Sequence, residues 1–150
     1  MALYVMIGIP GSGKSTWAKA NKKEKDIYVS RDEVRFSLLQ DGDEYFSKEK
    51  EVLKEFYRQI NEGLKQQKNV YVDATHLNKK SRDKLLNNLQ IDCPIIGVYV
   101  ATPLKVALER NEKRSGRSYV PPQVIKDMYN KLTLPTNEEK FDKVIKISAF

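Results

Sequence analysis

The fold of this chain is constrained most strongly by an eight-residue run near its start, GIPGSGKS at residues 8–15, which fits the pattern G-x-x-x-x-G-K-[ST]. A short apolar run, Leu3–Ile7, precedes it, and a segment with helical character, Lys14–Asn21, follows it. Glycines allow successive backbone N–H groups to point inward around phosphate oxygens, and the positive end of the following helix adds to the attraction. The run therefore predicts a strand, a phosphate-binding loop and a helix, in that order.

The side chains of this loop predict a site for a nucleoside triphosphate, for which we expect ATP with Mg²⁺. Lys14 would reach the β- and γ-phosphates, and the Ser15 hydroxyl would bind Mg²⁺. The chain has no N-K-x-D sequence, which reads guanine, and its 150 residues leave no room for the sensor elements of an oligomeric ATPase. A small phosphotransferase is therefore the favoured class. The other loop residues expected to contact the nucleotide are Gly11, Ser12, Gly13 and Thr16.

Beyond the loop, apolar runs and helical patterns alternate along the chain. Such alternation is typical of a parallel sheet covered on both faces. We expect strands at Leu3–Ile7, Ile27–Val29, Asn69–Val72, Pro94–Val100 and Lys143–Ile147. We expect helices at Lys14–Asn21, Arg31–Leu39 after a Ser30 cap, from Ser47 onward, at Lys79–Leu89, from Pro103 after a Thr102 cap, and from Pro121-Pro122 to Leu134. The predicted fold is an α/β P-loop NTPase with a parallel five-stranded sheet flanked by helices.

Composition places the chain among ordinary globular proteins, with 40% hydrophobic and 31% charged residues. Its length suits one domain, so we expect residues 1–150 to form a single P-loop kinase domain. No apolar run reaches the roughly 18 residues of a membrane span, and the start lacks the basic stretch of a secretion signal. The single cysteine, Cys93, excludes an internal disulfide framework. These features predict a cytoplasmic protein with no membrane partner.

The segment after the second predicted strand carries a candidate acceptor site. In an open parallel sheet, ligands bind at the carboxyl ends of the strands, so an acid placed there can face the γ-phosphate. Asp32 and Arg35 lie one helical turn apart, where they could hold a hydroxyl and a neighbouring phosphate together. An acid at a helix start is also ordinary helix chemistry. A base-stacking aromatic would have to be exposed beside Arg35, and Phe36 and Tyr45 are the candidates.

A basic segment later in the chain predicts a mobile lid over the phosphates. The net charge is +7, and residues 105–131 contain seven basic and three acidic residues, which is more than half of that excess. Its basic side chains include Arg110, Lys113, Arg114 and Arg117. They run from a helix into a flexible Ser115-Gly116 pair, so a helical lid at about 110–121 could close and stabilise transferring charge. The alternative is a basic helix end that complements its own dipole.

Three motifs together resemble the 5′-hydroxyl kinase domains of the bacteriophage polynucleotide kinase family, a group of small P-loop kinases. The first is G-x-P-G-S-G-K-S-T-W-A at residues 8–18, and the second is R-D-x-x-R at residues 31–35. The third is L-x-R-N-x-K-R at residues 108–114, followed by Val120-Pro121 and by Met128-Tyr129. The motifs occur in the family's order and cover essentially the whole chain.

The resemblance implies specific roles for residues of this sequence. Asp32 resembles the general base for the attacking 5′-hydroxyl, and Arg35 resembles the arginine that binds the phosphate on the 3′ side of the terminal nucleotide. Arg114 resembles the lid arginine that contacts the transferring phosphoryl group, with Arg110 nearby in support. Activity on DNA or RNA 5′-hydroxyl ends, and a functional link to a ligase, are what this family implies.

The third predicted strand ends in a candidate metal-orienting acid. An apolar strand followed by Asp73 suits a Walker B role, in which the carboxylate orients Mg²⁺ through water. In the phage enzyme the acid falls one position later, where this chain has Ala74, although many small relatives carry the D-A-T-x-L order seen here. Because side chains alternate along a strand, this offset matters physically. His76, the single histidine, needs no special role.

The favoured function is therefore an ATP-dependent polynucleotide 5′-hydroxyl kinase. Two alternatives stay open: a P-loop kinase of a small alcohol such as a nucleoside, sugar or antibiotic, and a nucleotide-binding module that transfers no phosphate. The best-known phage enzyme continues into a 3′-phosphatase domain with an Asp-x-Asp-Gly-Thr motif. That motif does not occur in these 150 residues, so we expect no phosphatase domain and no phosphatase activity.

Overall fold

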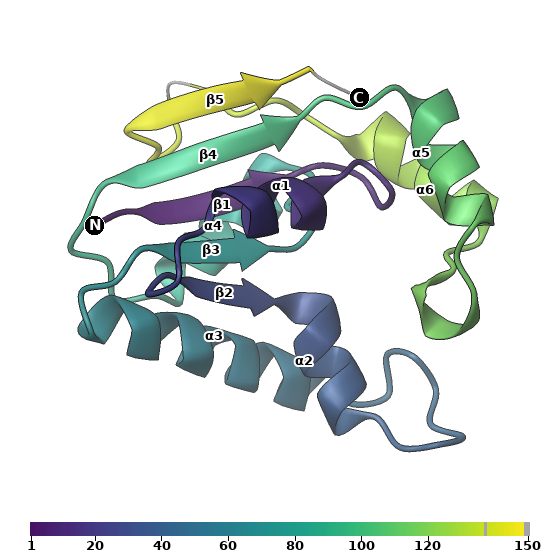
Figure 1. Ribbon diagram of the computed structural model, residues 1–150, viewed down its shortest axis with the longest axis horizontal. Helices are drawn as coiled ribbons and strands as arrows, with labels where there is room; N and C mark the ends of the chain where they lie inside the picture. The colour runs from purple at the N-terminus through teal and green to yellow at the C-terminus, as the bar shows by residue number, and fades with distance from the viewer. Residues whose placement is uncertain (137, 149–150) are drawn as a thin grey trace.

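The computed structural model describes residues 1–136 and 138–148, which form one parallel sheet with helices on both faces (Figure 1). The strands are β1 (Leu3–Ile7), β2 (Ile27–Ser30), β3 (Val70–Asp73), β4 (Ile95–Val100) and β5 (Lys143–Ile147), in the order β2-β3-β1-β4-β5. The helices are α1 (Lys14–Asn21), α2 (Arg31–Leu38), α3 (Glu49–Lys65), α4 (Lys79–Asn87), α5 (Leu104–Glu112) and α6 (Pro122–Lys131). The predicted α/β fold with five parallel strands is confirmed.

The alternation of side chains along β1 divides the core into two layers. Leu3, Val5 and Ile7 face the layer under α3 and α4, where they pack with residues such as Phe56. Met6 faces the opposite layer with Ala18 of α1. Figure 1 shows α1 in front of the sheet and α4 behind it. Because β1 and β3 lie inside the sheet and are buried on both faces, they read as continuous apolar runs.

Most element boundaries follow local signals in the sequence. The Ser30 hydroxyl accepts a hydrogen bond from the Glu33 backbone N–H at 3.2 Å, so the predicted cap of α2 is confirmed. The expected start of the fifth helix is wrong, because Thr102 donates its hydroxyl to the Ser12 carbonyl at 2.6 Å instead of capping, and α5 begins at Leu104. The sixth helix ends at Lys131 rather than at the expected Leu134. A proline at 135 disfavours helical backbone at the residue before it.

The lid segment differs from the helical lid that the sequence predicted. Between α5 and α6 the chain forms only a single 3₁₀ turn, η1 (Gly116–Ser118), flanked by extended residues. Gly116 has a φ of 60°, a left-handed conformation that glycine adopts without strain. The two flanking helices are fixed by a small core in which Ile9 of the phosphate loop packs with Ala107 and Ile125. The lid is thus a basic loop held at both ends against the nucleotide site.

A buried ion pair fixes the segment that follows α6. The Arg82 guanidinium of α4 contacts the Glu139 carboxylate at 2.7 Å, and both side chains are almost fully buried. The same guanidinium donates to the carbonyls of His76 and Thr133. Burial opposes ionisation of Glu139, but its hydrogen bonds to Arg82 and to a backbone N–H lower its pKa. These contacts join α4, the loop after β3 and the approach to β5.

Within the described residues, the helices are too short or too polar for any of them to cross a lipid bilayer. Cys93 is half-buried and packs against the larger core layer, and burial raises the pKa of its thiol. The cysteine therefore has a packing role in the core.

Candidate active site

All strands run in the same direction, so their carboxyl ends meet at one edge of the sheet, beside α2, α5 and α6 (Figure 1). A cleft with a volume of about 820 Å³ lies at this edge. Its walls come from the phosphate loop, from α2 and the loop after it, from the end of β3 and from the lid. The predicted site residues that line it are Gly11, Gly13, Lys14, Ser15, Thr16, Asp32, Arg35, Asp73 and Arg114. Residues as far apart in the sequence as Gly11 and Arg114 are thereby brought into one cavity.

The phosphate loop has a conformation that requires glycine. Gly11 and Gly13 have φ values of 81° and 98°. A Cβ on Gly11 would lie 2.6 Å from the Ala107 carbonyl oxygen, so no larger residue fits there. Among the described residues, the Ser12 hydroxyl is buried without a hydrogen-bond partner. A buried polar atom of this kind calls for a ligand, and a phosphate oxygen in the loop would satisfy it.

Two residues outside the loop hold its carbonyl groups away from the cleft. The Ser12 carbonyl accepts from the Thr102 hydroxyl at 2.6 Å and from the Arg110 guanidinium at 3.1 Å. Arg110 also contacts the Gly11 carbonyl at 3.3 Å and is not among the described residues that line the cleft. The carbonyl groups of Gly11 and Ser12 are therefore bonded to side chains that do not line the cleft. Arg110 therefore holds the phosphate loop through its carbonyl groups, from the side opposite the cleft.

Lys14 lies at the first position of α1 with its side chain turned back into the loop. Its ammonium donates to the Ile9 carbonyl at 3.1 Å and is almost completely buried. Burial lowers the pKa of Lys14, while the carboxylates of Asp73 and Asp32 oppose that shift. Phosphate oxygens would supply the counter-charge that a buried ammonium lacks. The residue thus fits the triphosphate that the loop pattern predicts.

Asp73 lies opposite the start of α1, at the end of β3. Its carboxylate accepts a hydrogen bond from the Ser15 hydroxyl at 2.6 Å and another from the Tyr28 hydroxyl. Burial, followed by the negative charge of Asp73, raises the pKa of Tyr28, which keeps that hydroxyl a donor. Ala74 instead packs against the larger core layer. The one-residue offset noted in the sequence is therefore compatible with an acid facing the Ser15 hydroxyl.

This pair fits a magnesium site of the type that needs substrate phosphates. The described residues contain no group of three or more acidic, histidine or cysteine side chains that could hold a metal alone. Mg²⁺ in phosphotransferases is commonly held by one or two protein oxygens together with phosphates and water. Ser15 and Asp73 are suited to that arrangement.

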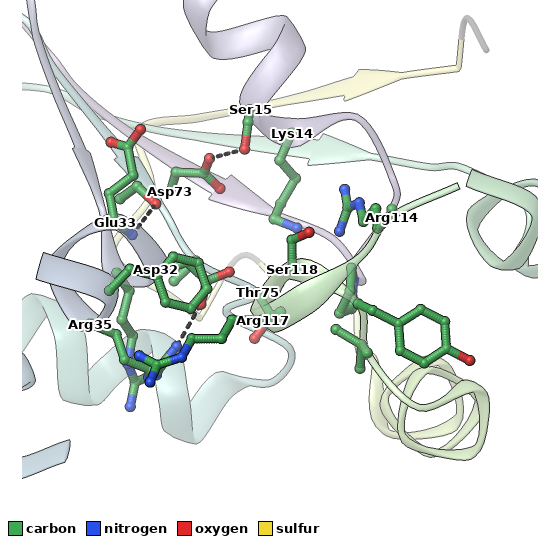
Figure 2. A pocket seen from close by; sticks show the side chains of 18 of the residues that line it. Lys14, Ser15, Asp32, Glu33, Arg35, Asp73, Thr75, Arg114, Arg117 and Ser118 are labelled. Carbon is green, nitrogen blue, oxygen red and sulfur yellow. Dashed lines mark hydrogen bonds and ion pairs between the residues drawn. The ribbon is translucent and has the colours of Figure 1, made fainter. Parts of the chain in front are cut away.

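Asp32 and Arg35 form an ion pair on the opposite wall of the cleft, and Figure 2 shows it beside Arg117. The two side chains approach to 2.5 Å, as their spacing on α2 predicted. The Tyr45 hydroxyl donates to the same Asp32 oxygen, Oδ1, at 3.0 Å and lies 3.0 Å from Arg35 Nη1. Among the described residues, Oδ2 of Asp32 accepts no hydrogen bond, and the side chain is 63% exposed. One carboxylate oxygen is fixed, and the other is available to a ligand.

Arg35 itself is nearly buried because Glu49, the first residue of α3, holds it from behind. Nε and Nη2 of Arg35 donate to the two Glu49 oxygens at 3.0 and 2.6 Å. With Nη1 bonded to Asp32 and Tyr45, these contacts use four of its five N–H donors. Arg31 also donates to Glu49, at 2.6 Å. Burial opposes ionisation of Glu49, but its hydrogen bonds to Arg35 and Arg31 lower its pKa.

The lid, between α5 and α6, forms a further wall of the cleft. Figure 2 shows Arg114 and Lys14 reaching toward the same space from different sides. Arg114 is exposed and near enough to Lys14 to lower the pKa of that ammonium. Arg117 donates to the Gln40 carbonyl at 2.9 Å, which connects the lid to the loop after α2. The lid thus lines the cleft and contacts the loop after α2.

Three contributors to this site were missed or only partly identified in the sequence. Tyr28 lies on β2 and reads as a core residue, while Glu49 reads as an ordinary acid at a helix start. Tyr45 was a stacking candidate, yet it bonds Asp32. All three act through tertiary contacts that no local pattern signals. His76 is buried outside the main cleft and donates Nδ1–H to the Met6 carbonyl at 2.6 Å, so its position is structural.

Fold and cleft together define a P-loop nucleotide-binding domain. A family model described as an AAA domain matches residues 3–135, and the chain belongs to that family. P-loop kinases use ATP, usually with Mg²⁺.

Two curated relatives match nearly the whole chain. An L-seryl-tRNA(Sec) kinase of Methanococcus maripaludis is 32% identical over 147 residues, which cover 93% of this chain and 56% of that protein. A provisionally named bifunctional polynucleotide kinase/RNA ligase of Autographa californica nuclear polyhedrosis virus is 34% identical over 157 residues, covering 93% and 22%. The chain thus spans about half of the first relative and about a fifth of the second. These names indicate a P-loop phosphotransferase.

A solved structure supports the same class. The chain superposes on one component of the Pnkp1/Rnl/Hen1 RNA repair complex with a TM-score of 0.76 at 25% identity. The match covers 87% of this chain and 43% of the other.

Proposed function

We propose that this protein is an ATP-dependent polynucleotide kinase that transfers the γ-phosphoryl group to the 5′-hydroxyl of DNA or RNA ends. The observation that carries the proposal is the position of Asp32, which lines the same cleft as Lys14 and Arg114 and has one carboxylate oxygen without a hydrogen bond among the described residues. A kinase needs such a carboxylate to orient a hydroxyl and accept its proton. The similarity to a polynucleotide kinase/RNA ligase and to an RNA repair component supports this acceptor.

The nucleotide side would be formed by the phosphate loop. The backbone of Gly11, Ser12 and Gly13 and the side chain of Thr16 would contact the phosphates, with Arg110 holding the loop from behind. Lys14 would neutralise charge on the transferred group, while Ser15 would bind Mg²⁺ and Asp73 would orient it. ATP and Mg²⁺ are therefore the proposed cofactors, and the catalytic contribution is positioning and charge neutralisation.

The acceptor side would be formed by α2 and the lid. Asp32 is the proposed base, and its bonds to Arg35 and Tyr45 leave Oδ2 to meet the 5′-hydroxyl. Arg35 has one unused N–H donor, so its proposed contact with a strand phosphate is a single hydrogen bond plus its charge. Arg114 would close over the γ-phosphoryl group. The domain would act in the cytoplasm, in nucleic-acid end repair alongside a ligase.

One further acceptor is favoured by a specific observation. The relative from Methanococcus maripaludis is named for the seryl group on a tRNA, which is a small alcohol carried by RNA. The same Asp32 and lid arginine would serve that hydroxyl. The same site would also accept the hydroxyl of a free small alcohol that is not attached to RNA.

The test offers γ-labelled ATP and Mg²⁺ together with one acceptor at a time: a 5′-hydroxyl DNA or RNA oligonucleotide, a seryl-tRNA, or a panel of nucleosides and small alcohols. Asp32→Asn keeps the shape of the side chain but removes the base, and Asp92→Asn is the control because Asp92 is exposed outside the cleft. We expect label on the oligonucleotide that falls about 10²–10⁴-fold in Asp32→Asn and is unchanged in Asp92→Asn.

Each other outcome contradicts a definite part of the proposal. Label confined to seryl-tRNA or to a small alcohol would reject the polynucleotide acceptor. ATP binding with no label on any acceptor would instead indicate a nucleotide-binding module. Full activity of Asp32→Asn on the oligonucleotide would reject Asp32 as the base.

A further inference from the structure

Phe46 is an exposed aromatic ring at the acceptor side of the cleft. Its side chain is 66% exposed, the largest exposed fraction among the large hydrophobic residues of the described chain, yet it lines the same cavity as Asp32. Phe36 and Tyr45, the two aromatic residues that the sequence singled out, are only partly exposed. Exposing a large apolar ring to water is unfavourable, so such a ring at a cleft indicates a binding contact.

The Phe46 ring packs against a cluster of two aromatic rings and one guanidinium group. Phe46 packs edge-on against Tyr45 with ring centroids 4.6 Å apart, and Tyr45 packs edge-on against Phe36 at 6.1 Å. The Arg35 guanidinium lies 4.6 Å from the Tyr45 centroid and 5.3 Å from the Phe46 centroid. Because Arg35 is itself fixed by Glu49, the support is rigid on the side away from the cleft.

The loop that carries Phe46 is tied to the protein on both sides of the ring. Lys48 donates to the Leu38 carbonyl at 2.9 Å and pairs with Asp43 at 3.2 Å. Asp43 also accepts from the Gln40 backbone N–H at 2.8 Å. These contacts hold the segment between α2 and α3 in one shape. The exposed ring is therefore presented by a structured loop.

The location of Phe46 and the residues around it indicate which kind of ligand group would pack on its ring. Tyr45 bonds Asp32, the proposed base, so a single side chain separates the Phe46 ring from Asp32. The lid contributes Tyr119 and Val120 to the same cleft, and α6 contributes Val124; Tyr119 is 41% exposed. The acceptor therefore enters between two largely apolar surfaces beside a carboxylate and several cations. A flat apolar group attached to an anionic strand suits that environment.

We propose that Phe46 is a stacking platform for the nucleobase of the terminal nucleotide whose hydroxyl is phosphorylated. The proposal rests on the proposed function and extends it, because it places a base, rather than a sugar or a simple alcohol, in the acceptor subsite. Every base has a π-face, so the contact tolerates all sequences. Removing it is expected to raise the KM of the acceptor about tenfold or more, without changing ATP binding.

The test measures acceptor KM for two oligonucleotides of equal length and charge, one with an ordinary 5′ nucleotide and one with an abasic 5′ nucleotide. The variants are Phe46→Ala and Phe46→Trp, and Tyr129→Ala is the matched control because Tyr129 is a 42% exposed aromatic outside the cleft lining. We expect Phe46→Ala to raise KM for the ordinary end only, Phe46→Trp to restore it, and Tyr129→Ala to have no effect.

Failure of the platform and failure of the proposed function give different results. If the wild type phosphorylates both ends and Phe46→Ala raises their KM equally, or not at all, the platform is rejected while the kinase stands. If the wild type phosphorylates free nucleosides but no oligonucleotide, the polynucleotide function is rejected. A higher nucleoside KM in Phe46→Ala would then still support stacking, and an unchanged one would reject it.

Discussion

At the scale of single residues, the ion pair of Asp32 and Arg35 shows that sequence spacing can predict a contact without predicting its orientation. The spacing of Asp32 and Arg35 was enough to predict that they meet. Their orientation, however, depends on Glu49, which lies 14 positions from Arg35 and holds the back of its guanidinium. An acid at the start of α3 therefore controls a carboxylate on α2. That dependence is testable through Glu49 alone.

We expect Glu49→Gln to lower kcat about tenfold and to destabilise the protein by about 1–3 kcal/mol, because charge-assisted hydrogen bonds to two arginines are lost. The KM of ATP is expected to stay the same, since the nucleotide side is untouched. Glu51→Gln is the control, because Glu51 is exposed in the same first turn of α3. Steady-state kinetics and urea unfolding measure both effects. Equal losses in the two variants would argue against a positioning role for Glu49.

His76 makes stability depend on pH. Burial lowers its pKa to about 4, opposed by the hydrogen bond to Met6. In the unfolded chain the histidine has an ordinary pKa of about 6.5 and takes up a proton first, so stability is full above that value and falls as pH drops toward 4. Between about pH 7.5 and about pH 5, this residue is expected to remove about 2 kcal/mol.

The measurement for His76 is the free energy of unfolding at both pH values in wild type and His76→Asn. Asparagine tolerates the positive φ of 47° at this position and keeps an N–H donor. The part of the fall in unfolding free energy between the two pH values that comes from His76 should be absent in the variant. An identical pH dependence in both proteins would show that other groups cause it.

At the scale of elements, strands and helices were predictable where a local signal exists. Runs of apolar residues located all five strands, and the Ser30 cap located the start of α2. The start of α5 was not predictable, because Thr102 binds a loop carbonyl 90 positions away. The lid was expected to be helical, but Gly116 and two following prolines leave only a 3₁₀ turn. Tertiary contacts and backbone restrictions decided these cases, and neither has a periodic signature.

The lid loop is expected to act through Arg114 in particular. Arg114→Ala should lower kcat about 10²–10³-fold with little change in ATP binding, because a charge aimed at the transferring group matters most in the transition state. Lys113→Ala is the control, since Lys113 is a neighbouring exposed cation that is not among the cleft-lining residues. Single-turnover phosphoryl transfer measures the step directly. A similar loss in both variants would indicate general attraction rather than a specific contact.

The ion pair between α4 and the segment before β5 is expected to dominate local stability. Glu139→Gln leaves the Arg82 charge buried without its counter-ion, and removing one partner of such a pair costs about 3–5 kcal/mol. Glu138→Gln is the neighbouring control. Urea unfolding followed by circular dichroism gives the difference. A loss below about 1 kcal/mol, as at an exposed pair, would contradict the buried geometry.

At the scale of the whole molecule, the sheet topology places the cleft and the basic segment of residues 105–131 at the same edge, the carboxyl ends of the strands. Parallel strands bring the phosphate loop, α2 and the lid together, and this convergence followed from the predicted fold class. What the sequence could not provide was the wall between them, to which Tyr28, Tyr45 and Phe46 contribute and which Glu49 supports through Arg35. Each of these residues reads locally as core, turn or surface. A cleft is a property of the folded surface, so its wall has no linear pattern.

The basic excess at this edge leads to the last prediction, a salt dependence specific to a polyanionic acceptor. If the strand contacts two or three phosphates, the KM of a single-stranded oligonucleotide should rise about tenfold between about 50 and 200 mM salt, because bound counter-ions are released on binding. A nucleoside acceptor has no phosphates, so its KM should barely change, and the ratio of the two cancels any effect of salt on ATP. The measurement is KM for both acceptors at several salt concentrations with saturating ATP. Parallel slopes would mean that the net charge of +7 acts on ATP or on solubility rather than on the acceptor strand.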